Sequence, residues 1–164
     1  MVREYRGRDA QDTDREDLAR FPCPAYGGHA LEVEDLIAGL LDWRAERVDR
    51  VVRIFDAPDA PMVAVLAYET LDELRPESGV FVPVFGVRRG FERQGVAKAV
   101  LVGLVNHLQA VCPGGWLVFR VDAANTEMVT FCTEYSNTEP SVCEDDRRFF
   151  EYAVVLPGDP DTLV

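Results

Sequence analysis

The chain has 164 residues with 17 basic and 29 acidic side chains, which gives a formal net charge of −12. A chain of this length corresponds to about one domain, so we expect a single domain over residues 1–164 that needs no disulfide or metal to fold. Nucleic acids and anionic membrane surfaces both attract lysine and arginine, so this charge argues against either as a partner. It favours a cationic substrate instead, such as an amine or a lysine-bearing protein.

Three of the first six residues are charged and no apolar stretch follows them, which argues against a signal peptide. The longest apolar runs, such as residues 62–68, are far shorter than the ~20 residues of a membrane-spanning helix. The four cysteines are widely spaced and there are only two histidines, a composition that argues against a Cys/His zinc site. We therefore expect a cytoplasmic protein with reduced thiols and no metal.

The first half of the chain predicts two helical stretches and a hairpin. Residues 9–20 open with capping candidates and acids, which is typical of a short, exposed helix. Over residues 31–43 the apolar side chains recur mostly at spacings of three and four, the pattern of one helical face. Residues 48–55 and 62–68 are apolar runs joined by a short Pro/Asp turn, which predicts an antiparallel hairpin.

The second half predicts a mixed sheet with intervening helices. Residues 80–87 form a third strand, in which Pro83 indicates an edge, a bulge or a splayed pair because proline cannot donate to a ladder. The later elements are a helix from about residue 96 to 111, a strand at 116–121, a short helix at 125–135 and a strand at 149–156. This order predicts an α/β (α+β) domain built on a mixed sheet.

The segment over residues 87–98 carries the strongest chemical signal. An apolar strand runs into a loop with Gly90 and Gly95 and then opens a helix. Glycines let the backbone approach a ligand, and the first turn of a helix offers unpaired N–H groups to an anion. The loop's three arginines, which suit a phosphate or pyrophosphate, are Arg88, Arg89 and Arg93. The spacing fits neither a Walker loop nor a dinucleotide fingerprint, and an ordinary surface turn is the alternative.

This loop resembles the signature of the GCN5-related N-acetyltransferases, the GNAT family. That signature, R/Q-x-x-G-x-G/A, lies between a splayed strand and a helix and cradles the pyrophosphate of acetyl-CoA through backbone amides. The residues from Gly95 to Ala97 match its G-x-A half, whereas Glu92 stands where the family prefers Arg or Gln. Arg93 or Arg89 could supply the missing side-chain charge.

Further matches extend the resemblance over residues 48–156. Pro83 lies in the strand that GNAT proteins splay to admit the pantetheine arm, and Asn125 is similar to the Asn that begins their last helix. The resemblance implies a GNAT-like mixed, mostly antiparallel central sheet with a splayed strand pair, flanked by helices. It also leaves open a homodimer, because such folds often dimerise.

The resemblance implies an acyl-CoA-dependent N-acyltransferase with acetyl-CoA as co-substrate. Such an enzyme transfers acetyl to a primary amine of a small molecule or protein by direct attack, with the thioester along residues 84–87. The implied cofactor-binding residues are Phe85, Val87, Arg88, Arg93, Gln94, Gly95, Val96, Ala97, Lys98 and Asn125.

Three residues are candidates for proton transfer. The family often places a Tyr seven residues after that Asn, to protonate the departing thiolate, and this chain has Cys132 there. The Cys132 thiol could protonate a thiolate of similar pKa, or be a small buried residue. Tyr135, one helical turn on, could supply a hydroxyl or be a surface aromatic. Glu69, ahead of Asp72 and Glu73, is the candidate general base, and solvated turn residues are the alternative.

A different class of function stays open beside the enzyme. Glu92 and Cys132 both stand where the family carries function, so the chain could be a catalytically inactive binding module of this fold that still binds CoA. An acetyltransferase that acts on charged tRNA is disfavoured by the net charge.

Overall fold

The computed structural model describes residues 4–23, 30–70, 79–123, 126–136, 141–143 and 149–156. The chain groups into two compact units, Met1–Glu69 with Val84–Leu101 and Thr70–Pro83 with Val102–Val164. A seven-stranded sheet runs in the order β1-β2-β3-β4-β5-β7-β6, so the predicted mixed, mostly antiparallel sheet is confirmed. The single domain over residues 1–164 stays a prediction. No helix in the described ranges has the length and apolar character to cross a membrane.

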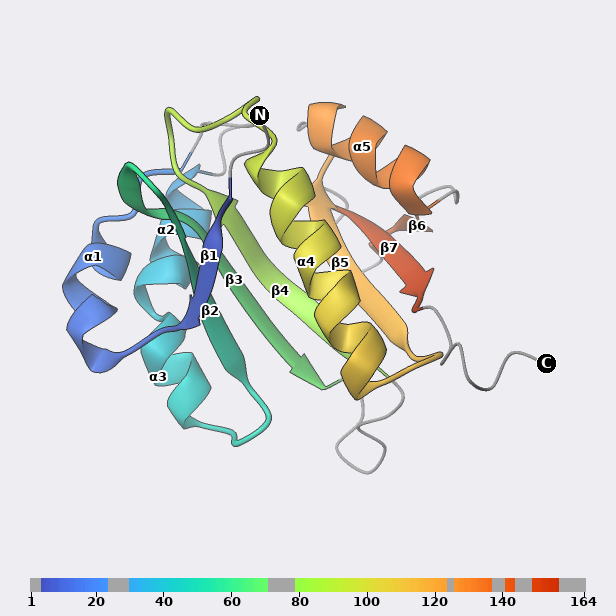
Figure 1. Cartoon of the computed structure of the whole chain (residues 1–164), viewed down its shortest axis with the longest axis horizontal. Helices are drawn as coiled ribbons and strands as arrows, with labels where there is room; N and C mark the ends of the chain where they lie inside the picture. The colour runs from blue at the N-terminus through green and yellow to red at the C-terminus, as the bar shows by residue number, and fades with distance from the viewer. Residues whose placement is uncertain are drawn as a thin grey trace. The chain divides into compact units, whose positions relative to one another are not determined.

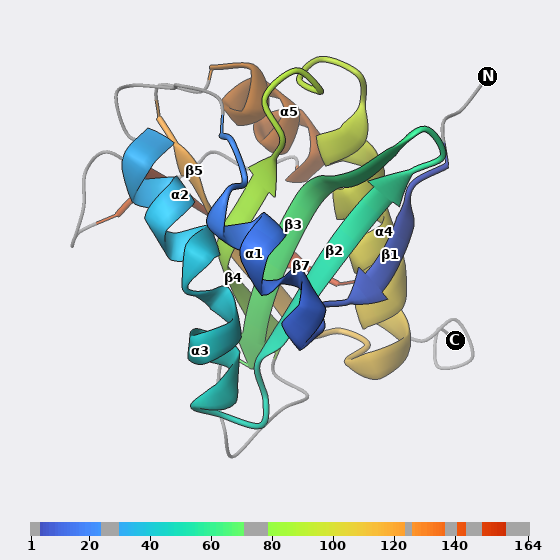
Figure 2. The ribbon, with the colours of Figure 1, turned by 90° about the vertical axis from the view of Figure 1, so that its left-hand side faces the viewer.

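The first unit is an antiparallel ladder with helices on one face (Figures 1 and 2). Its elements are β1 (Arg6–Asp9), the 3-10 helix η1 (Asp12–Asp14), α1 (Arg15–Ala19), α2 (Ala30–Ala38), α3 (Leu40–Ala45), β2 (Val51–Ala57) and β3 (Ala60–Thr70). The predicted hairpin is confirmed as β2 and β3, which pair antiparallel. Strand β4 (Gly79–Val87) begins in the second unit and ends in the first. Helix α4 (Val96–Val111) begins in the first unit and ends in the second.

Two predictions for the N-terminal part need correction. The helix expected over residues 9–20 is wrong at its start, because Arg6–Asp9 form strand β1 and pair with β2, and only residues 12–19 are helical. A four-residue edge strand made of three charged residues and a glycine has no apolar period that would reveal it. The helix expected over residues 31–43 is divided at Gly39 into α2 and α3.

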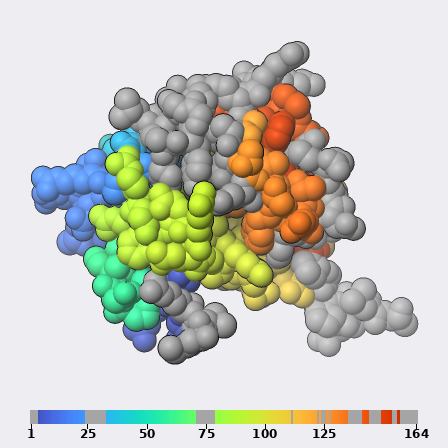
Figure 3. Space-filling view, turned by 90° about the horizontal axis from the view of Figure 1, so that it is seen from above, coloured from blue at the N-terminus to red at the C-terminus, as the bar shows by residue number. Residues whose placement is uncertain are grey.

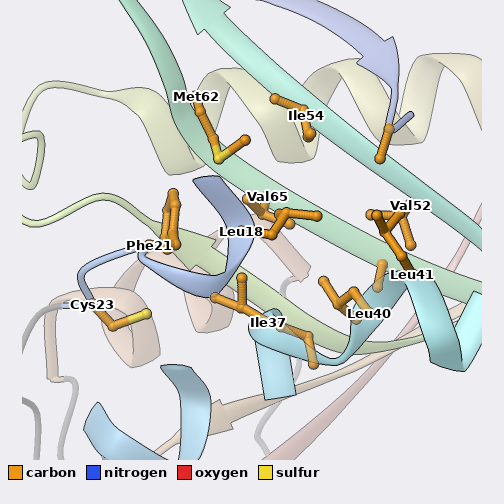
Figure 4. Close-up of a cluster of buried hydrophobic side chains, with 13 residues drawn as sticks. Leu18, Phe21, Cys23, Ile37, Leu40, Leu41, Val52, Ile54, Met62 and Val65 are labelled. Atoms are coloured by element: carbon orange, nitrogen blue, oxygen red, sulfur yellow. The ribbon is translucent and has the colours of Figure 1, made fainter. Parts of the chain in front are cut away.

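The apolar faces of these helices pack on the hairpin (Figure 4). Ile37 of α2 and Leu18 of α1 are almost fully buried, as are Ile54 of β2 and Val65 of β3. Each such side chain contributes roughly 1.5–3 kcal/mol when it leaves water. Of the apolar side chains spaced three and four apart along residues 31–43, Ile37, Leu40 and Leu41 are buried and Val33 and Trp43 are partly buried. Leu36, expected on the same face, is 55% exposed, and the Leu31 side chain lies outside the described residues.

A polar cluster around Arg8 fastens the edge strand to its neighbours. The Arg8 guanidinium donates to both carboxylate oxygens of Asp14, at 2.8 and 3.0 Å, and to Asp56 at 3.0 Å. Asp56 also accepts the N–H of Met62 at 2.7 Å, next to a left-handed backbone at Met62 (φ 48°). These bonds hold the pKa of the buried Asp14 carboxyl below its usual value, chiefly because Arg8 donates to its charged form.

We expect Asp14→Asn to destabilise the protein in a pH-dependent way. The folded-state pKa of Asp14 is lowered, so its contribution is present above the unfolded pKa of about 4 and is lost as the pH falls further. The loss in unfolding free energy should be about 2 kcal/mol at pH 7 and should shrink towards pH 3, as measured by urea unfolding. Asp42→Asn is the control, because the Asp42 side chain is 77% exposed beside Arg15. Equal losses in the two variants would contradict the expectation.

The second unit combines a parallel and an antiparallel pairing. The first part of β4 pairs parallel with β5 (Trp116–Asp122), and this pairing ends at Val82, directly before Pro83. β5 pairs antiparallel with β7 (Phe149–Val155), which also pairs with the short, unpredicted β6 (Ser141–Val142). The end of the parallel pairing agrees with the absence of an N–H on Pro83.

Helix α5 (Thr126–Ser136) packs on β7 and β5 within the second unit. The buried Tyr152 of β7 donates its hydroxyl to the Val129 carbonyl at 3.0 Å and lies 2.8 Å from the Thr133 hydroxyl. Its ring stacks on Phe119 of β5 at a centroid distance of 5.4 Å. The predicted strands at 116–121 and 149–156 and the helix at 125–135 are thus confirmed to within a residue or two at their ends.

Candidate functional site

The end of β4 presents two faces. Val84 and Gly86 are buried on one face, where a Cβ at Gly86 would lie 2.9 Å from the Ile37 side chain. Phe85 and Val87 alternate with them and are half-buried on the other face. Directly after the strand, the N–H of Arg88 donates to the Val63 carbonyl of β3 at 2.8 Å. Phe85 and Val87, both predicted to bind the cofactor, therefore share a face directly before the loop.

The loop over residues 88–95 turns by means of left-handed backbone. Gly90 and Gly95 have φ of 97° and 78°, and Arg93 between them has φ of 64°. A non-glycine residue in this region costs on the order of 1 kcal/mol. Arg93, Gln94 and Gly95 are all exposed, and Figure 3 shows this segment in yellow-green on the surface.

Helix α4 begins directly after this turn. The first helical bond runs from the N–H of Ala99 to the carbonyl of Gly95 at 3.0 Å, so the preceding amides of Val96, Ala97 and Lys98 have no partner inside the helix. Val96 is buried and anchors the turn, while Lys98 is exposed. Such a helix start attracts an anion through its N–H groups and its dipole. A Cβ at Gly95 would meet no atom of the described residues within 4 Å, which leaves room for a phosphate.

Arg89 forms hydrogen bonds with backbone carbonyls of the segment before α2. Its Nε and Nη2 donate to the Cys23 carbonyl, 66 positions away in the chain, at 3.2 and 2.9 Å. Its N–H donates to the Pro22 carbonyl at 2.8 Å, and Nη2 lies 3.7 Å from Glu34. Glu34 also accepts the N–H of Cys23 at 3.0 Å. The sequence carried no signal for this contact of Glu34, and Arg89 joins the loop to the segment before α2 instead of facing a phosphate.

The other polar side chains of the loop are also engaged. Arg88 donates through Nη1 to the Pro61 carbonyl at 3.3 Å. Glu92, which replaces the family's Arg or Gln, accepts the N–H of Gly90 at 2.6 Å. The side-chain amide of Gln94 donates to the Gly90 carbonyl at 3.2 Å. The backbone carbonyl of Gln94 accepts a hydrogen bond from the Tyr5 hydroxyl at 3.4 Å. The loop is therefore shaped by bonds within the protein.

Cys132 lies in the second unit and is buried in α5. Burial raises the pKa of its thiol to about 12, so the thiol is protonated at neutral pH and is a weak acid and a weak nucleophile. These surroundings support the structural alternative for Cys132. The backbone of Tyr135 belongs to α5, but its side chain and the whole of Asn125 lie outside the described residues, as do Asp72 and Glu73.

Glu69 lies at the far end of β3 from the loop. It is six residues beyond Val63, the partner of Arg88, which is about 20 Å along a strand. Its carboxylate accepts Nε of Arg50 at 2.8 Å and lies 3.8 Å from Nη1 of Arg47. Arg50 also stacks on Trp43 at 4.6 Å. The structure thus places Glu69 in an ion-pair network that joins β3 to the end of α3, and not beside the loop.

In the part of the chain that the structure describes, no group of three or more His, Cys, Asp or Glu side chains is arranged to hold a metal ion.

Two glycines of the α4 segment provide a matched stability test. Gly95→Ala should lower the unfolding free energy by about 1 kcal/mol, because alanine is strained at φ of 78° although nothing described lies in its way. Gly103→Ala, at an exposed helical position with equally open space, should raise it by about 0.5–1 kcal/mol. Thermal or urea unfolding of both variants checks this, and a gain in stability for Gly95→Ala would contradict the assigned backbone.

The four cysteines should react slowly with thiol reagents in the folded protein. All four are buried, and burial raises the pKa of Cys23 to about 11 and of Cys132 to about 12. We expect labelling by a chromogenic disulfide at pH 8 to be at least about a hundredfold slower than in the urea-unfolded chain, because all four sulfurs are buried and Cys23 and Cys132 also hold very little thiolate. A cysteine that labels rapidly in the native protein would show that its thiol is accessible.

Comparison with known proteins was made by family models, by sequence and by structure. No family model matches the chain, and no curated protein matches it. Solved structures match along almost the whole length. A spermidine N-acetyltransferase chimera of SpeG from Vibrio cholerae and hSSAT superposes with a TM-score of 0.71 at 10% identity, covering 93% of this chain and 95% of that one.

Two further structures agree with this result. A GNAT-family acetyltransferase from Staphylococcus aureus Mu50 has a TM-score of 0.64 at 12% identity and covers 92% of this chain and 99% of its own. AtaTR bound with AcCoA has a TM-score of 0.59 at 15% identity and covers 92% and 93%. At such low identities the likeness is one of fold. The chain therefore has the fold of the GCN5-related N-acetyltransferases.

Proposed function

We propose that this protein is an acyl-CoA-dependent N-acyltransferase that transfers acetyl from acetyl-CoA to a primary amine. The observation that carries the proposal is the loop over residues 88–95, which turns through left-handed backbone and opens α4 with amides that have no partner inside the helix. On this fold, the loop matches the G-x-A half of the pyrophosphate-binding signature at Gly95 to Ala97.

The cofactor would bind mainly through backbone groups. The amides of Val96, Ala97 and Lys98, which have no partner inside the helix, would receive the pyrophosphate, and the exposed Arg93 lies on the same turn. Phe85 and Val87 form the face of β4 along which the acyl-pantetheine arm would run. AtaTR, which shares the fold, was solved with AcCoA, and this supports the same co-substrate here.

The proposed reaction is a direct transfer. The amine nitrogen attacks the thioester carbonyl, a C–N bond forms, the C–S bond breaks, and CoA leaves as a thiolate that takes up a proton while the amine loses one. The protein contributes proximity and orientation, and a backbone amide near the end of β4 would polarise the carbonyl. The buried Cys132 thiol, with a pKa near 12, does not favour an acyl-enzyme route.

We propose a cationic acceptor. The net charge of −12 attracts cations and so raises their concentration near the protein. The same charge repels nucleic acids and anionic surfaces. The spermidine N-acetyltransferase chimera with the same fold is named for a polyamine acceptor, which agrees with this class.

Thermal melting with CoA, acetyl-CoA, ATP and NAD tests the cofactor site. A ligand at 100 times its Kd adds about 2.7 kcal/mol, which corresponds to a rise of roughly 5–10 °C in Tm for this size of chain. We expect the rise with CoA and acetyl-CoA alone, and a much smaller one for Arg93→Glu. Arg15→Glu, the same substitution on the exposed side of α1, is the matched control and should keep the full rise. No rise with either CoA species would overturn the proposal.

Turnover separates the enzyme from an inactive binding module. A panel of monoamines, diamines and polyamines is incubated with acetyl-CoA, and release of the CoA thiol is followed. Release that depends on an amine supports the transferase, whereas a CoA-dependent rise in Tm without release from any amine favours the binding module.

A further inference from the structure

Glu92 stands where the resembling signature carries Arg or Gln, and its charge alone would repel a phosphate. We propose instead that Glu92 is a positioning residue, which holds the loop over residues 88–95 in its ligand-binding shape. The inference rests on the proposed function, because it concerns how the same loop takes CoA.

The contact that carries the inference is short and directed into the loop. The Glu92 carboxylate accepts the N–H of Gly90 at 2.6 Å. The Gln94 side-chain amide donates to the carbonyl of the same Gly90 at 3.2 Å. Both backbone polar groups of Gly90 are therefore held by side chains of the loop.

These two bonds flank the strained part of the turn. Arg93 lies between Glu92 and Gln94 and has a left-handed backbone with φ of 64°. Such a conformation is strained for a residue other than glycine and persists only where the surroundings determine it. A hydrogen bond of the Glu92 type is stabilising and can offset that strain.

A loop shaped before the ligand arrives loses less conformational freedom on binding. Two further hydrogen bonds hold the ends of the loop in this conformation. The Tyr5 hydroxyl donates to the backbone carbonyl of Gln94, and the Arg89 side chain donates to the Cys23 carbonyl. The Glu92 carboxylate thus has two opposing effects on a bound phosphate: it repels the charge and it keeps the amides of α4 in place.

Two substitutions separate these effects. Glu92→Gln removes the charge and keeps an oxygen that can accept the Gly90 N–H, whereas Glu92→Ala removes both. We expect Glu92→Ala to bind CoA about three- to tenfold more weakly than Glu92→Gln, in calorimetric titrations of the full chain. The ratio should be the same at low and high salt, because salt screens the repulsion and not the hydrogen bond.

Hydrogen exchange of the ligand-free protein provides a readout that does not depend on CoA. Exchange over residues 88–95 should be faster in Glu92→Ala than in Glu92→Gln and in the unaltered chain. Asp59→Asn and Asp59→Ala, at an exposed acid in the turn between β2 and β3, are the matched control pair and should not differ from each other in either measurement.

Equal CoA affinity of Glu92→Ala and Glu92→Gln, both tighter than that of the unaltered chain, would overturn the inference and leave repulsion as the only role of Glu92. Equal exchange rates over residues 88–95 in the two variants would overturn it as well. If the unaltered chain does not bind CoA while exchange still differs between the variants, the proposed function fails and the role of Glu92 in shaping the loop stands.

Discussion

The hydrogen bonds between Arg89 and the chain before α2 hold the first unit together at the point where its candidate site begins. Two side-chain nitrogens of Arg89 donate to the Cys23 carbonyl, and its backbone N–H donates to that of Pro22. A buried segment without regular structure needs such donors, because an unpaired backbone carbonyl away from water is costly. Glu34 completes the arrangement by accepting the N–H of Cys23, and Gly86 leaves space for Ile37 beside it. The end of β4 and the start of the loop are thereby fixed against α2.

The shape of the loop follows from this fixed start. Left-handed backbone at Gly90, Arg93 and Gly95 turns the chain within six residues, directly before α4 begins with amides that have no partner inside the helix. Because the groups proposed to bind the pyrophosphate belong to the backbone, the side chain at position 92 is not required to contact a phosphate itself. A glutamate is compatible with the site when its carboxylate turns back onto Gly90, as it does here.

Two of the candidates for proton transfer have side chains that the structure describes, and both side chains are engaged in packing or ion pairs within the protein. Glu69 joins Arg50 and Arg47 at the far end of β3, and Cys132 is buried in α5 with a pKa near 12. An acetyl transfer to an amine can draw most of its acceleration from orientation and from polarisation of the carbonyl. The direct transfer proposed above relies on this kind of catalysis, for which the loop before α4 provides backbone groups.

The β2–β3 hairpin, the later strands and helices apart from β6, an irregular pairing at Pro83 and the glycine-containing loop before α4 could all be predicted from the sequence. Each depends on short-range patterns: alternation, helical spacing, and the conformational limits of proline and glycine. Only the tertiary structure decided that Arg6–Asp9 form an edge strand, that the Arg89 side chain donates to the Cys23 carbonyl, and that Glu69 belongs to an ion-pair network. These contacts join residues between 19 and 66 positions apart. No short-range pattern identifies the partner of a charged side chain, because folding alone brings the two residues together.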